Sequence, residues 1–347
     1  MDRRTVEAYE GADAAQRYID RRAAYEPERA VAFASRVEGW RADIGSGPGH
    51  YTTHLGAPLV SLDASAAMLA RVTSGARVQA DLEALPLRRG ALRGAWASKC
   101  YQHIPHEALP LALADLHRSM ALDAPLVLNV FTGEGTRITD GEDDFPGRLF
   151  SWWQPHDLAR VVEGAGFVID ETVVHGRHVE VLATRARMLP DLVRPGLRVL
   201  FCGYNPSIYA ADVGVAFARP GNRFWPAALA AGIVSVDRDP WHAVRHHRVG
   251  FTDMVKRASV AAAELSRDEL HEGFERVTRL CEWLHPEVVC VLGVGGWRQL
   301  VNRKAIVGWQ PETLGGSRVY VMPNPSGLNA STQHEGYVEH LTRVSGF

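Results

Sequence analysis

The feature that most constrains this chain is a repeated alternation of short apolar strands with helical segments. In the first part of the sequence, strands are predicted at residues 40–44, 59–62, 77–80, 94–98 and 125–131. Most of them end on a polar or glycine-rich turn, and helical patterns lie between several of them. Strands that alternate with helices in this way indicate a parallel sheet covered by helices on both faces.

The alternation stops near residues 185–196 and then begins again. Two prolines and Gly196 break both helical and strand patterns there, so this segment is predicted to join two domains. Further strands and helices are predicted at residues 198–202, 222–231, 267–284, 287–292 and 318–322. At roughly 100–200 residues per domain, 347 residues accommodate two α/β domains, which we place at residues 1–187 and 188–347.

Composition excludes several classes of protein. Hydrophobic residues make up 46% of the chain, as in an ordinary globular protein, and no apolar run approaches the length of a membrane span. The start of the chain has no apolar segment typical of a secretory signal. The 4 cysteines lack metal-binding spacing. We therefore expect a metal-free monomer in the cytoplasm, and the net charge of −2 does not indicate nucleic-acid binding.

A glycine-rich turn follows the first predicted strand. It reads Asp43-Ile-Gly45-Ser-Gly47-Pro-Gly49 and leads into a helix, where glycines allow a ligand close to the backbone and free N–H groups. Asp63 and Asp81 follow the next two predicted strands. Asp63 is placed to bind ribose hydroxyls and Asp81 an adenine amino group, because ligands of open parallel sheets bind at the carboxyl ends of the strands.

With this order of motifs, roughly residues 30–185 resemble the class I S-adenosylmethionine-dependent methyltransferases. The resemblance implies a Rossmann-like sheet and S-adenosylmethionine rather than NAD as the cofactor. It also implies a cofactor site formed by Asp43, Gly45, Gly47, Gly49, Asp63 and Asp81. A retained fold with an inactive site is the alternative. The sequence does not indicate the methyl acceptor. His103 either faces the acceptor cleft or is a structural histidine.

The second half carries two polar loops, each directly after a predicted strand. They are residues 203–207 (Gly-Tyr-Asn-Pro-Ser) and 324–329 (Asn-Pro-Ser-Gly-Leu-Asn). Between them lies an aromatic and basic segment, residues 214–225. Two such loops can converge on one cleft of an α/β sheet. Taken singly, each has an ordinary explanation: Asn205 and Asn324 as turn residues and Phe217 as a core residue.

Together these blocks make residues 188–347 resemble the mismatch-specific uracil/thymine DNA glycosylases of the uracil-DNA glycosylase superfamily, with a three-layer α/β/α fold. In this resemblance, Asn205 holds the water that attacks the sugar, and Phe217 stacks on the extruded base. The other residues of the implied base site are Gly203, Tyr204, Ser207 and Asn324. The implied wedge and guanine contacts are Pro325, Ser326, Gly327 and Leu328.

The resemblance implies a monofunctional enzyme that hydrolyses the glycosidic bond of uracil or a related base in double-stranded DNA with a mismatched or damaged base. No lysine occupies the two loops, so no Schiff-base step is expected, and the glycosylase half needs no cofactor. Tyr204 and Ser207 replace the family's usual isoleucine and glycine. Because serine is larger than glycine, we expect Ser207 to increase discrimination against thymine.

Two other hypotheses remain for the whole chain. One is a methyltransferase whose C-terminal half is only a DNA-binding module. The other is a protein that binds damaged DNA without catalysis. Arg219 and Arg223 fit either phosphate contacts or structural ion pairs. The joint presence of Asn205, Phe217 and the 324–328 segment favours the glycosylase.

Overall fold

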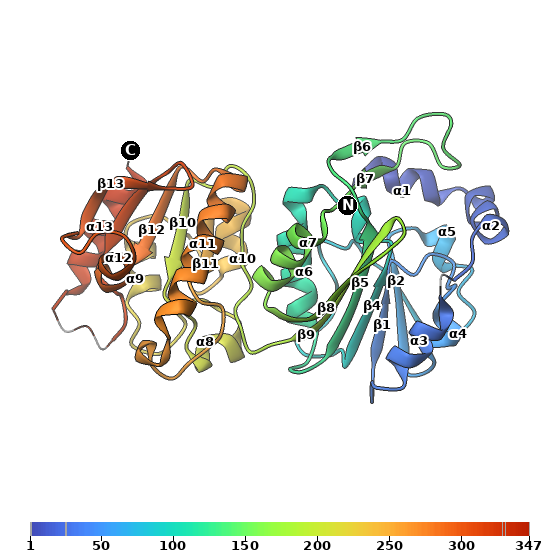
Figure 1. Ribbon diagram of the computed structural model, residues 1–347, viewed down its shortest axis with the longest axis horizontal. Coiled ribbons are helices and arrows are strands. Elements are labelled where there is room, and N and C mark those ends of the chain that lie inside the picture. Colours follow the sequence, from blue (N-terminus) through green and yellow to red (C-terminus); the bar gives the residue numbers. More distant parts are fainter. Residues whose placement is uncertain (1, 25, 328, 330, 347) are drawn as a thin grey trace. The chain divides into compact units, whose positions relative to one another are not determined.

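The computed structural model describes residues 2–24, 26–327, 329 and 331–346, and its chain divides into two compact units. The first unit comprises Met1–Ala186 and the second Arg187–Phe347. Each is an α/β unit with its own sheet, which confirms the predicted fold class (Figure 1). Among the described residues, no helix combines the length and the apolar character needed to cross a lipid bilayer.

The sheet of the first unit has 7 strands in the order β3-β2-β1-β4-β5-β9-β8. Their bounds are β1 Arg41–Ile44, β2 Leu59–Asp63, β3 Ala76–Gln79, β4 Gly94–Ser98, β5 Pro125–Phe131, β8 Phe167–His175 and β9 His178–Arg185. Strands β1 to β5 are parallel, and β9 pairs antiparallel with both β5 and β8. All residues of the central strand β1 are buried, as expected where helices cover both faces.

Helices surround this first sheet. They are α1 Arg3–Glu10, α2 Ala12–Arg21, α3 Pro27–Ala34, α4 Thr52–Leu55, α5 Ala66–Leu69, α6 Leu109–Ser119 and α7 Pro155–Gly164, with 3₁₀ turns at Tyr101–His103 and His106–Ala108. Figure 1 shows α6 and α7 on one side of the sheet and α3 and α4 on the other. A small separate hairpin is formed by β6 (Thr136–Ile138) and β7 (Leu149–Ser151).

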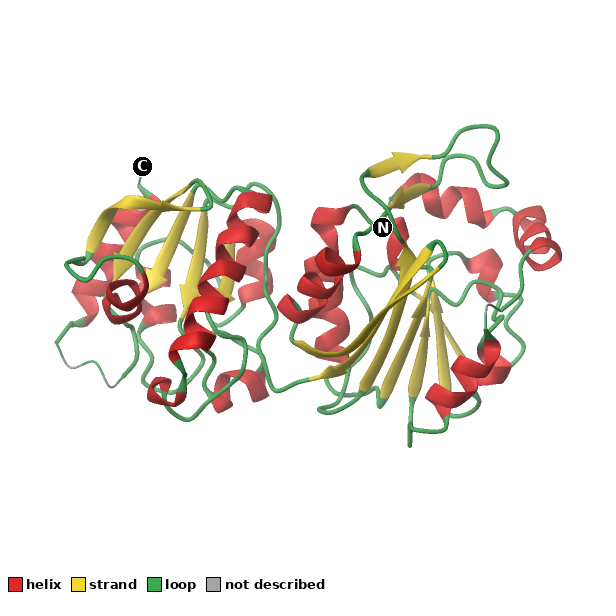
Figure 2. Cartoon of the chain, in the orientation of Figure 1, coloured by secondary structure: helices red, strands yellow, loops and turns green. Residues whose placement is uncertain are grey.

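The sheet of the second unit has 5 strands in the order β11-β10-β12-β14-β13. Their bounds are β10 Val199–Gly203, β11 Val249–Asp253, β12 Val288–Leu292, β13 Gly308–Leu314 and β14 Ser317–Met322. The first four in spatial order are parallel, so their carboxyl ends share one edge, whereas β13 is an antiparallel edge strand (Figure 2). Strands β10, β11 and β12 are buried throughout, which fits a doubly covered sheet.

The helices of the second unit connect these strands. They are α8 Ile208–Val213, α9 Phe224–Ala230, α10 Pro240–His246, α11 Arg267–Leu284, α12 Val294–Leu300 and α13 His334–Ser345, with a 3₁₀ turn at Ala262–Glu264. Helix α11 has the bounds predicted from the sequence. Ser266 and Glu269 form a capping box at its start, and His285 ends it in a left-handed conformation.

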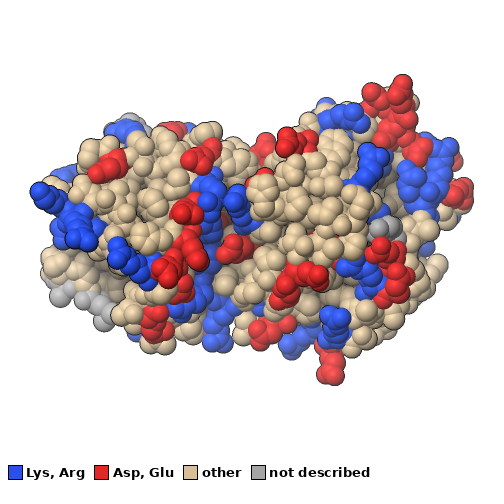
Figure 3. Space-filling view, in the orientation of Figure 1, with Lys and Arg blue, Asp and Glu red and all other residues tan. Residues whose placement is uncertain are grey.

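The surface carries both signs of charge. On the face shown in Figure 3, Lys and Arg side chains are interspersed with Asp and Glu side chains, in keeping with a net charge of −2. The four cysteines are buried free thiols. Burial raises the pKa of each of these thiols, so they are uncharged at neutral pH.

Candidate active sites

The glycine-rich turn after β1 adopts a backbone that only glycine tolerates well. Gly45, Gly47 and Gly49 have φ angles of 64°, 53° and 88°, in the left-handed region. A Cβ atom at Gly45 would collide with the side chain of Cys100, and one at Gly49 would lie 2.7 Å from the Thr52 hydroxyl. The three glycines therefore allow a turn that packs closely on Cys100 and Thr52, and Gly45 and Gly47 also line the cavity described below.

One buried and one half-buried carboxyl group flank this turn. Asp43 is 1% exposed, and its Oδ2 has no hydrogen-bond partner among the described residues. Burial, and then the nearby Asp63, raise the pKa of Asp43 to about 8. Asp63 accepts hydrogen bonds from the backbone N–H groups of Gly47 (2.8 Å) and Ser65 (2.9 Å), which oppose the rise that burial causes in its pKa. A cationic or hydroxyl-bearing ligand would satisfy this pair.

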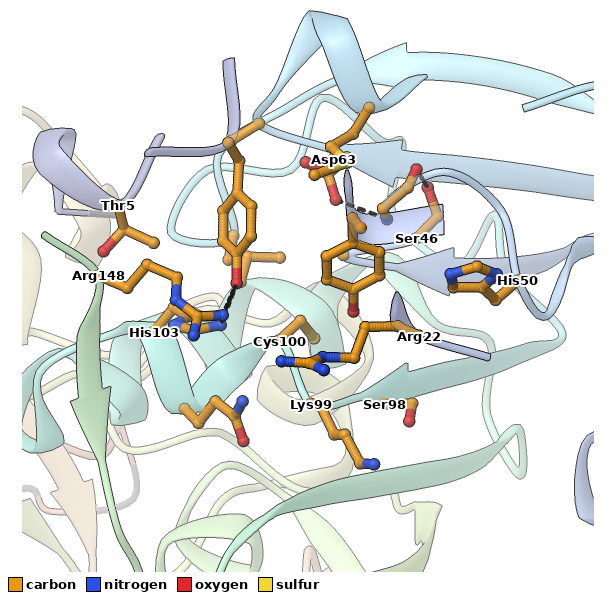
Figure 4. Close-up of a pocket in the computed structure, with 18 of the residues that line it drawn as sticks. Thr5, Arg22, Ser46, His50, Asp63, Ser98, Lys99, Cys100, His103 and Arg148 are labelled. Atoms are coloured by element: carbon orange, nitrogen blue, oxygen red, sulfur yellow. Dashed lines mark hydrogen bonds between the residues drawn. The ribbon is translucent and has the colours of Figure 1, made fainter. Parts of the chain in front are cut away.

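The two carboxyl groups line a cavity of about 210 Å³. Its wall comes from α1 and α2, the glycine-rich turn, and the segment after β4, as Figure 4 shows. Among its polar and aromatic lining residues are Tyr9, Tyr18, Arg22, His50, Ser98, Lys99, Gln102, His103, Phe131, Arg148 and Phe150. The contribution of Tyr9 in α1 and Tyr18 in α2 to this wall was not predicted from the sequence.

His103 lies in this wall and is also firmly held. Its Nδ1 is 2.8 Å from the Leu149 carbonyl oxygen, which can only accept, so Nδ1 carries the proton and Nε2 is an acceptor. Nε2 lies 3.4 Å from the Tyr9 hydroxyl, which accepts a 2.6 Å hydrogen bond from Arg148. Burial lowers the pKa of His103 to about 4, so the ring is neutral. His103 therefore has a structural hydrogen bond and also lines the cavity, and its contact with a methyl acceptor stays a prediction.

Not every residue of the expected cofactor set lines the cavity. Asp43, Gly45, Gly47 and Asp63 do, whereas Gly49 packs against Thr52 and Val72. Asp81 is exposed and accepts a 2.9 Å hydrogen bond from the Glu83 backbone, and its neighbour Leu82 reaches the cavity instead.

In the second unit, Gly203 ends β10 opposite Asp253 of β11. A Cβ atom at Gly203 would collide with the Asp253 Oδ1 atom and lie 3.3 Å from Cε1 of Phe217. Because residue 203 is a glycine, the Asp253 carboxyl group and the Phe217 ring can both approach the end of β10. Phe217 itself has a φ of 57°, unusual for a bulky residue, and its ring centroid is 4.7 Å from that of Phe224.

The Asn205 side chain is oriented by a neighbouring segment. Its Nδ2 donates to the Ser259 hydroxyl (2.8 Å) and to the Arg257 carbonyl (3.1 Å). Ser259 is 4% exposed and donates in turn to the Ala261 carbonyl at 2.8 Å. These bonds engage the amide N–H groups and leave Oδ1 as the atom that can accept a hydrogen bond from a water molecule. Neither Ser259 nor Arg257 was singled out from the sequence.

Tyr204 connects the first strand-end loop to the second. A Cβ atom at Gly293, just after β12, would lie 3.5 Å from Tyr204 Cε2 and 3.6 Å from Asn324 Cβ. A Cβ atom at Gly296 would collide with the Tyr204 ring. The loops that follow β10 and β14 therefore meet over the end of β12, as their placement after parallel strands predicts.

The segment at residues 214–225 lies against the 324–329 loop. The Arg223 backbone donates to the Pro325 carbonyl (2.9 Å), and its guanidinium donates to the Asn329 (2.8 Å) and Thr332 (2.7 Å) carbonyls. Arg223 thus holds the loop backbone, and its contact with a DNA phosphate stays a prediction. A Cβ atom at Gly327 would lie 3.0 Å from the Gly221 carbonyl oxygen.

Other residues of the expected set have local partners. Asn324 Oδ1 accepts from the Ser326 backbone at 3.0 Å, and Ser207 is the N-cap of α8, where its hydroxyl accepts from the Ala210 N–H at 3.2 Å. Pro325 is buried and Ser326 partly buried. Leu328, the expected wedge, lies outside the described residues.

The structure thus has two α/β units, each with polar or glycine-rich loops after its parallel strands. Residues 190–343 match the model of the uracil DNA glycosylase superfamily, and residues 42–128 match that of a methyltransferase domain. The chain therefore joins a methyltransferase domain to a domain of the uracil DNA glycosylase superfamily, as the sequence predicted. Both are families of enzymes.

Solved methyltransferase structures are similar to part of the chain. A methyltransferase of Methanosarcina mazei shares 13% identity over 48% of this chain and 99% of its own, with a TM-score of 0.42. The 1,6-didemethyltoxoflavin N1-methyltransferase of Burkholderia thailandensis, solved with S-adenosylhomocysteine, shares 18% identity over 50% of this chain and 86% of its own, with a TM-score of 0.40. Because the sequence identities and TM-scores are this low, the two domains are assigned from the family models and not from these structures.

Proposed function

We propose that the C-terminal domain is a monofunctional DNA glycosylase that extrudes uracil from G·U mismatches and hydrolyses its bond to the sugar, with thymine in G·T mismatches as a poorer substrate. The observation that supports this proposal is that Phe217 lies against Gly203 in the loop that carries Asn205, and that Tyr204 of the same loop and Asn324 both lie against Gly293. A base inside a duplex is out of reach of such an edge, so it must be flipped, at a cost of a few kcal/mol.

Different residues of the site would carry out different steps of this reaction. Stacking of the flipped base on Phe217 would offset the free-energy cost of flipping by roughly 1–3 kcal/mol. The tight 324–329 loop would contact the guanine left behind, with Leu328 as the wedge. Asn205 Oδ1 would accept a hydrogen bond from the attacking water and hold it below the sugar as positive charge develops there. An amide is a poor base, so we expect a slow enzyme that depends on positioning.

The glycosylase proposal is tested by base release from a G·U duplex. Single-turnover incubation with excess enzyme, followed by alkali and a denaturing gel, measures release of uracil as strand cleavage. Wild type should cleave, and Asn205→Ala should be slower by roughly 100-fold or more because the water is no longer positioned. The surface variant Asp237→Asn is the matched control. A wild type that binds the duplex without releasing uracil would favour the non-catalytic alternative.

We also propose that the N-terminal domain binds S-adenosylmethionine. The carboxyl oxygen of Asp43 that has no partner among the described residues, and the glycine-rich turn beside it, support a ligand that carries cationic and hydroxyl groups, as this one does. Asp43 would face the amino group and Asp63 the ribose hydroxyls. When bound, the cofactor supplies an electrophilic methyl group, and His103 and Arg148 would line the space for the acceptor. Calorimetric titration with S-adenosylmethionine and S-adenosylhomocysteine, on wild type and Asp43→Asn, tests this.

A further inference from the structure

The cavity of the N-terminal unit has a part that the proposed cofactor contacts do not use. The two carboxyl groups and the glycine-rich turn form one part of its wall, and Figure 4 shows His103 and Arg148 apart from Ser46 and His50 of that part. The wall around His103 comes from helix α1, the 3₁₀ turn after β4, the end of β5 and strand β7. This second part of the cavity is therefore open to a second molecule.

Aromatic rings line this second part. Tyr9, Phe131 and Phe150 all contribute to the wall. The ring centroid of Phe150 lies 4.7 Å from that of His103 and 5.8 Å from that of Phe131. The Tyr9 ring meets His103 edge-on, with centroids 5.8 Å apart. Rings in contact like these offer flat apolar surfaces on which a planar ring compound can stack.

Two neighbouring side chains add one acceptor and one donor to these rings. His103 donates from Nδ1 to the Leu149 carbonyl, so its Nε2 accepts, and the Tyr9 hydroxyl at 3.4 Å is only a long contact. Gln102 is 3% exposed, and the Phe131 N–H meets its side chain at 3.3 Å. A backbone N–H can only donate, so this contact fixes Oε1 as the acceptor and leaves Nε2 as a donor. Among the described residues, no acceptor for Nε2 is found, and a buried N–H group without one is costly.

The charges around this pair of side chains are already balanced. Arg148 is buried and donates to both carboxylate oxygens of Asp143, at 2.5 Å and 2.8 Å. Burial lowers the pKa of His103 to about 4, so its ring is neutral. Arg22 and Lys99 also border the cavity, and Figure 4 shows both of them apart from His103 and Arg148. The surroundings of His103 therefore favour an uncharged molecule over an ion, because a buried ion needs a partner of opposite charge.

Helix α1 covers this part of the cavity and is held on two sides. The Ser65 hydroxyl donates to the Tyr9 carbonyl at 2.9 Å, and the Leu149 N–H donates to the Thr5 hydroxyl at 2.8 Å. A nucleic-acid strand would have to displace α1 and break these hydrogen bonds to bring a base to His103. A small molecule fits beneath the helix once it has entered, so the cover favours a small acceptor.

We propose that this second part of the cavity is the methyl-acceptor site and that its substrates are small, uncharged, planar ring compounds with an N–H or O–H group and a carbonyl oxygen. The N–H or O–H group donates to His103 Nε2, the carbonyl oxygen accepts from Gln102 Nε2, and the ring stacks on the aromatic wall. This inference rests on the proposed binding of S-adenosylmethionine and names the substrate class of the same domain.

The test measures binding of two matched probes. The full-length protein, saturated with S-adenosylhomocysteine, is titrated with 2-quinolinone and with 1-methyl-2-quinolinone, which lacks the ring N–H, and ligand-observed NMR gives both dissociation constants. Wild type should bind 2-quinolinone roughly 2- to 13-fold more tightly, as one hydrogen bond predicts. His103→Asn keeps a side-chain N–H for the Leu149 carbonyl and loses the Nε2 acceptor, so it should bind the two probes alike. His156→Asn, at an exposed histidine of α7, is the matched control and should behave as wild type.

The outcomes are distinguishable. No binding of 2-quinolinone, equal binding of both probes by wild type, or a preference that survives in His103→Asn overturns the acceptor class. Transfer of a tritiated methyl group from S-adenosylmethionine to a G·U duplex or to its separated strands overturns it as well. Failure of S-adenosylhomocysteine to bind in calorimetry, measured before any probe is added, defeats the proposed function of the domain itself. If His103→Asn proves unstable by thermal unfolding, Gln102→Glu supplies the second readout: it keeps an oxygen for the Phe131 N–H and loses the donor, so both probes should bind more weakly.

Discussion

The contact between Asn205 and Ser259 gives the most informative single perturbation of the glycosylase site. Ser259→Ala removes the 2.8 Å hydrogen bond from Asn205 Nδ2 and leaves the bonds to the Arg257 carbonyl (3.1 Å) and the Pro206 carbonyl (3.3 Å). The amide then loses its shortest hydrogen bond. A hydrogen bond of this kind contributes about 0.5–1.5 kcal/mol, so the single-turnover rate of uracil release should fall by roughly 2- to 13-fold.

The assay separates positioning of Asn205 from general damage. Ser259 also donates to the Ala261 carbonyl, so thermal unfolding of each variant must be measured alongside release. Ser259→Thr keeps the hydroxyl and should stay close to the wild-type rate. Duplex affinity, measured by fluorescence anisotropy, should be unchanged in Ser259→Ala, because the serine is buried and reaches DNA only through Asn205. A wild-type rate in Ser259→Ala, or a loss confined to duplex affinity, would refute the reasoning.

Further predictions concern both domains. Gly45→Ala should destabilise the N-terminal unit by about 2–5 kcal/mol, since it combines a left-handed φ of 64° with a collision against Cys100, and thermal unfolding that matched wild type would contradict this. Asp43→Asn should weaken S-adenosylmethionine binding by roughly 10- to 100-fold in calorimetry, because a charge-assisted contact is lost; equal affinity would argue against the assigned site. Ser207→Gly should raise the rate of base release from G·T relative to that from G·U in the gel assay. Because Ser207 is the N-cap of α8, the change should also lower the free energy of unfolding by roughly a few tenths of a kcal/mol. An unchanged ratio of the two rates would show that Ser207 does not discriminate against thymine.

Much of the fold was predictable because strands buried on both faces have a strong signal. The runs at β10 and β12 are almost wholly apolar and that at β14 is apolar after Arg318, and each was predicted within a residue or so of its observed bounds. The α11 bounds agree with the predicted range, and the structure shows a capping box of Ser266 and Glu269 at its start. The edge strand β13 was not predicted, because its burial alternates and its sequence includes a proline and a glycine.

The candidate sites were predictable where a loop directly follows a strand. Asn205 and Asn324 were placed together on that basis, and Tyr204 joins their loops at Gly293. Residues that act through tertiary contacts gave no such signal. Ser259, for example, has no signal of its own and meets Asn205 across more than fifty positions of the chain. Asp81 follows a strand but turns outward to cap its own turn.

The most direct test of the central claim is a crystal structure with a duplex that carries 2′-fluorodeoxyuridine opposite guanine, since fluorine at C2′ disfavours the cationic transition state and preserves the substrate. We predict that the uracil is extruded and stacked on Phe217, with a water molecule between Asn205 Oδ1 and C1′ and the 324–329 loop against the unpaired guanine. A uracil that stays in the helix, or a duplex bound away from this edge of the second sheet, would contradict the account.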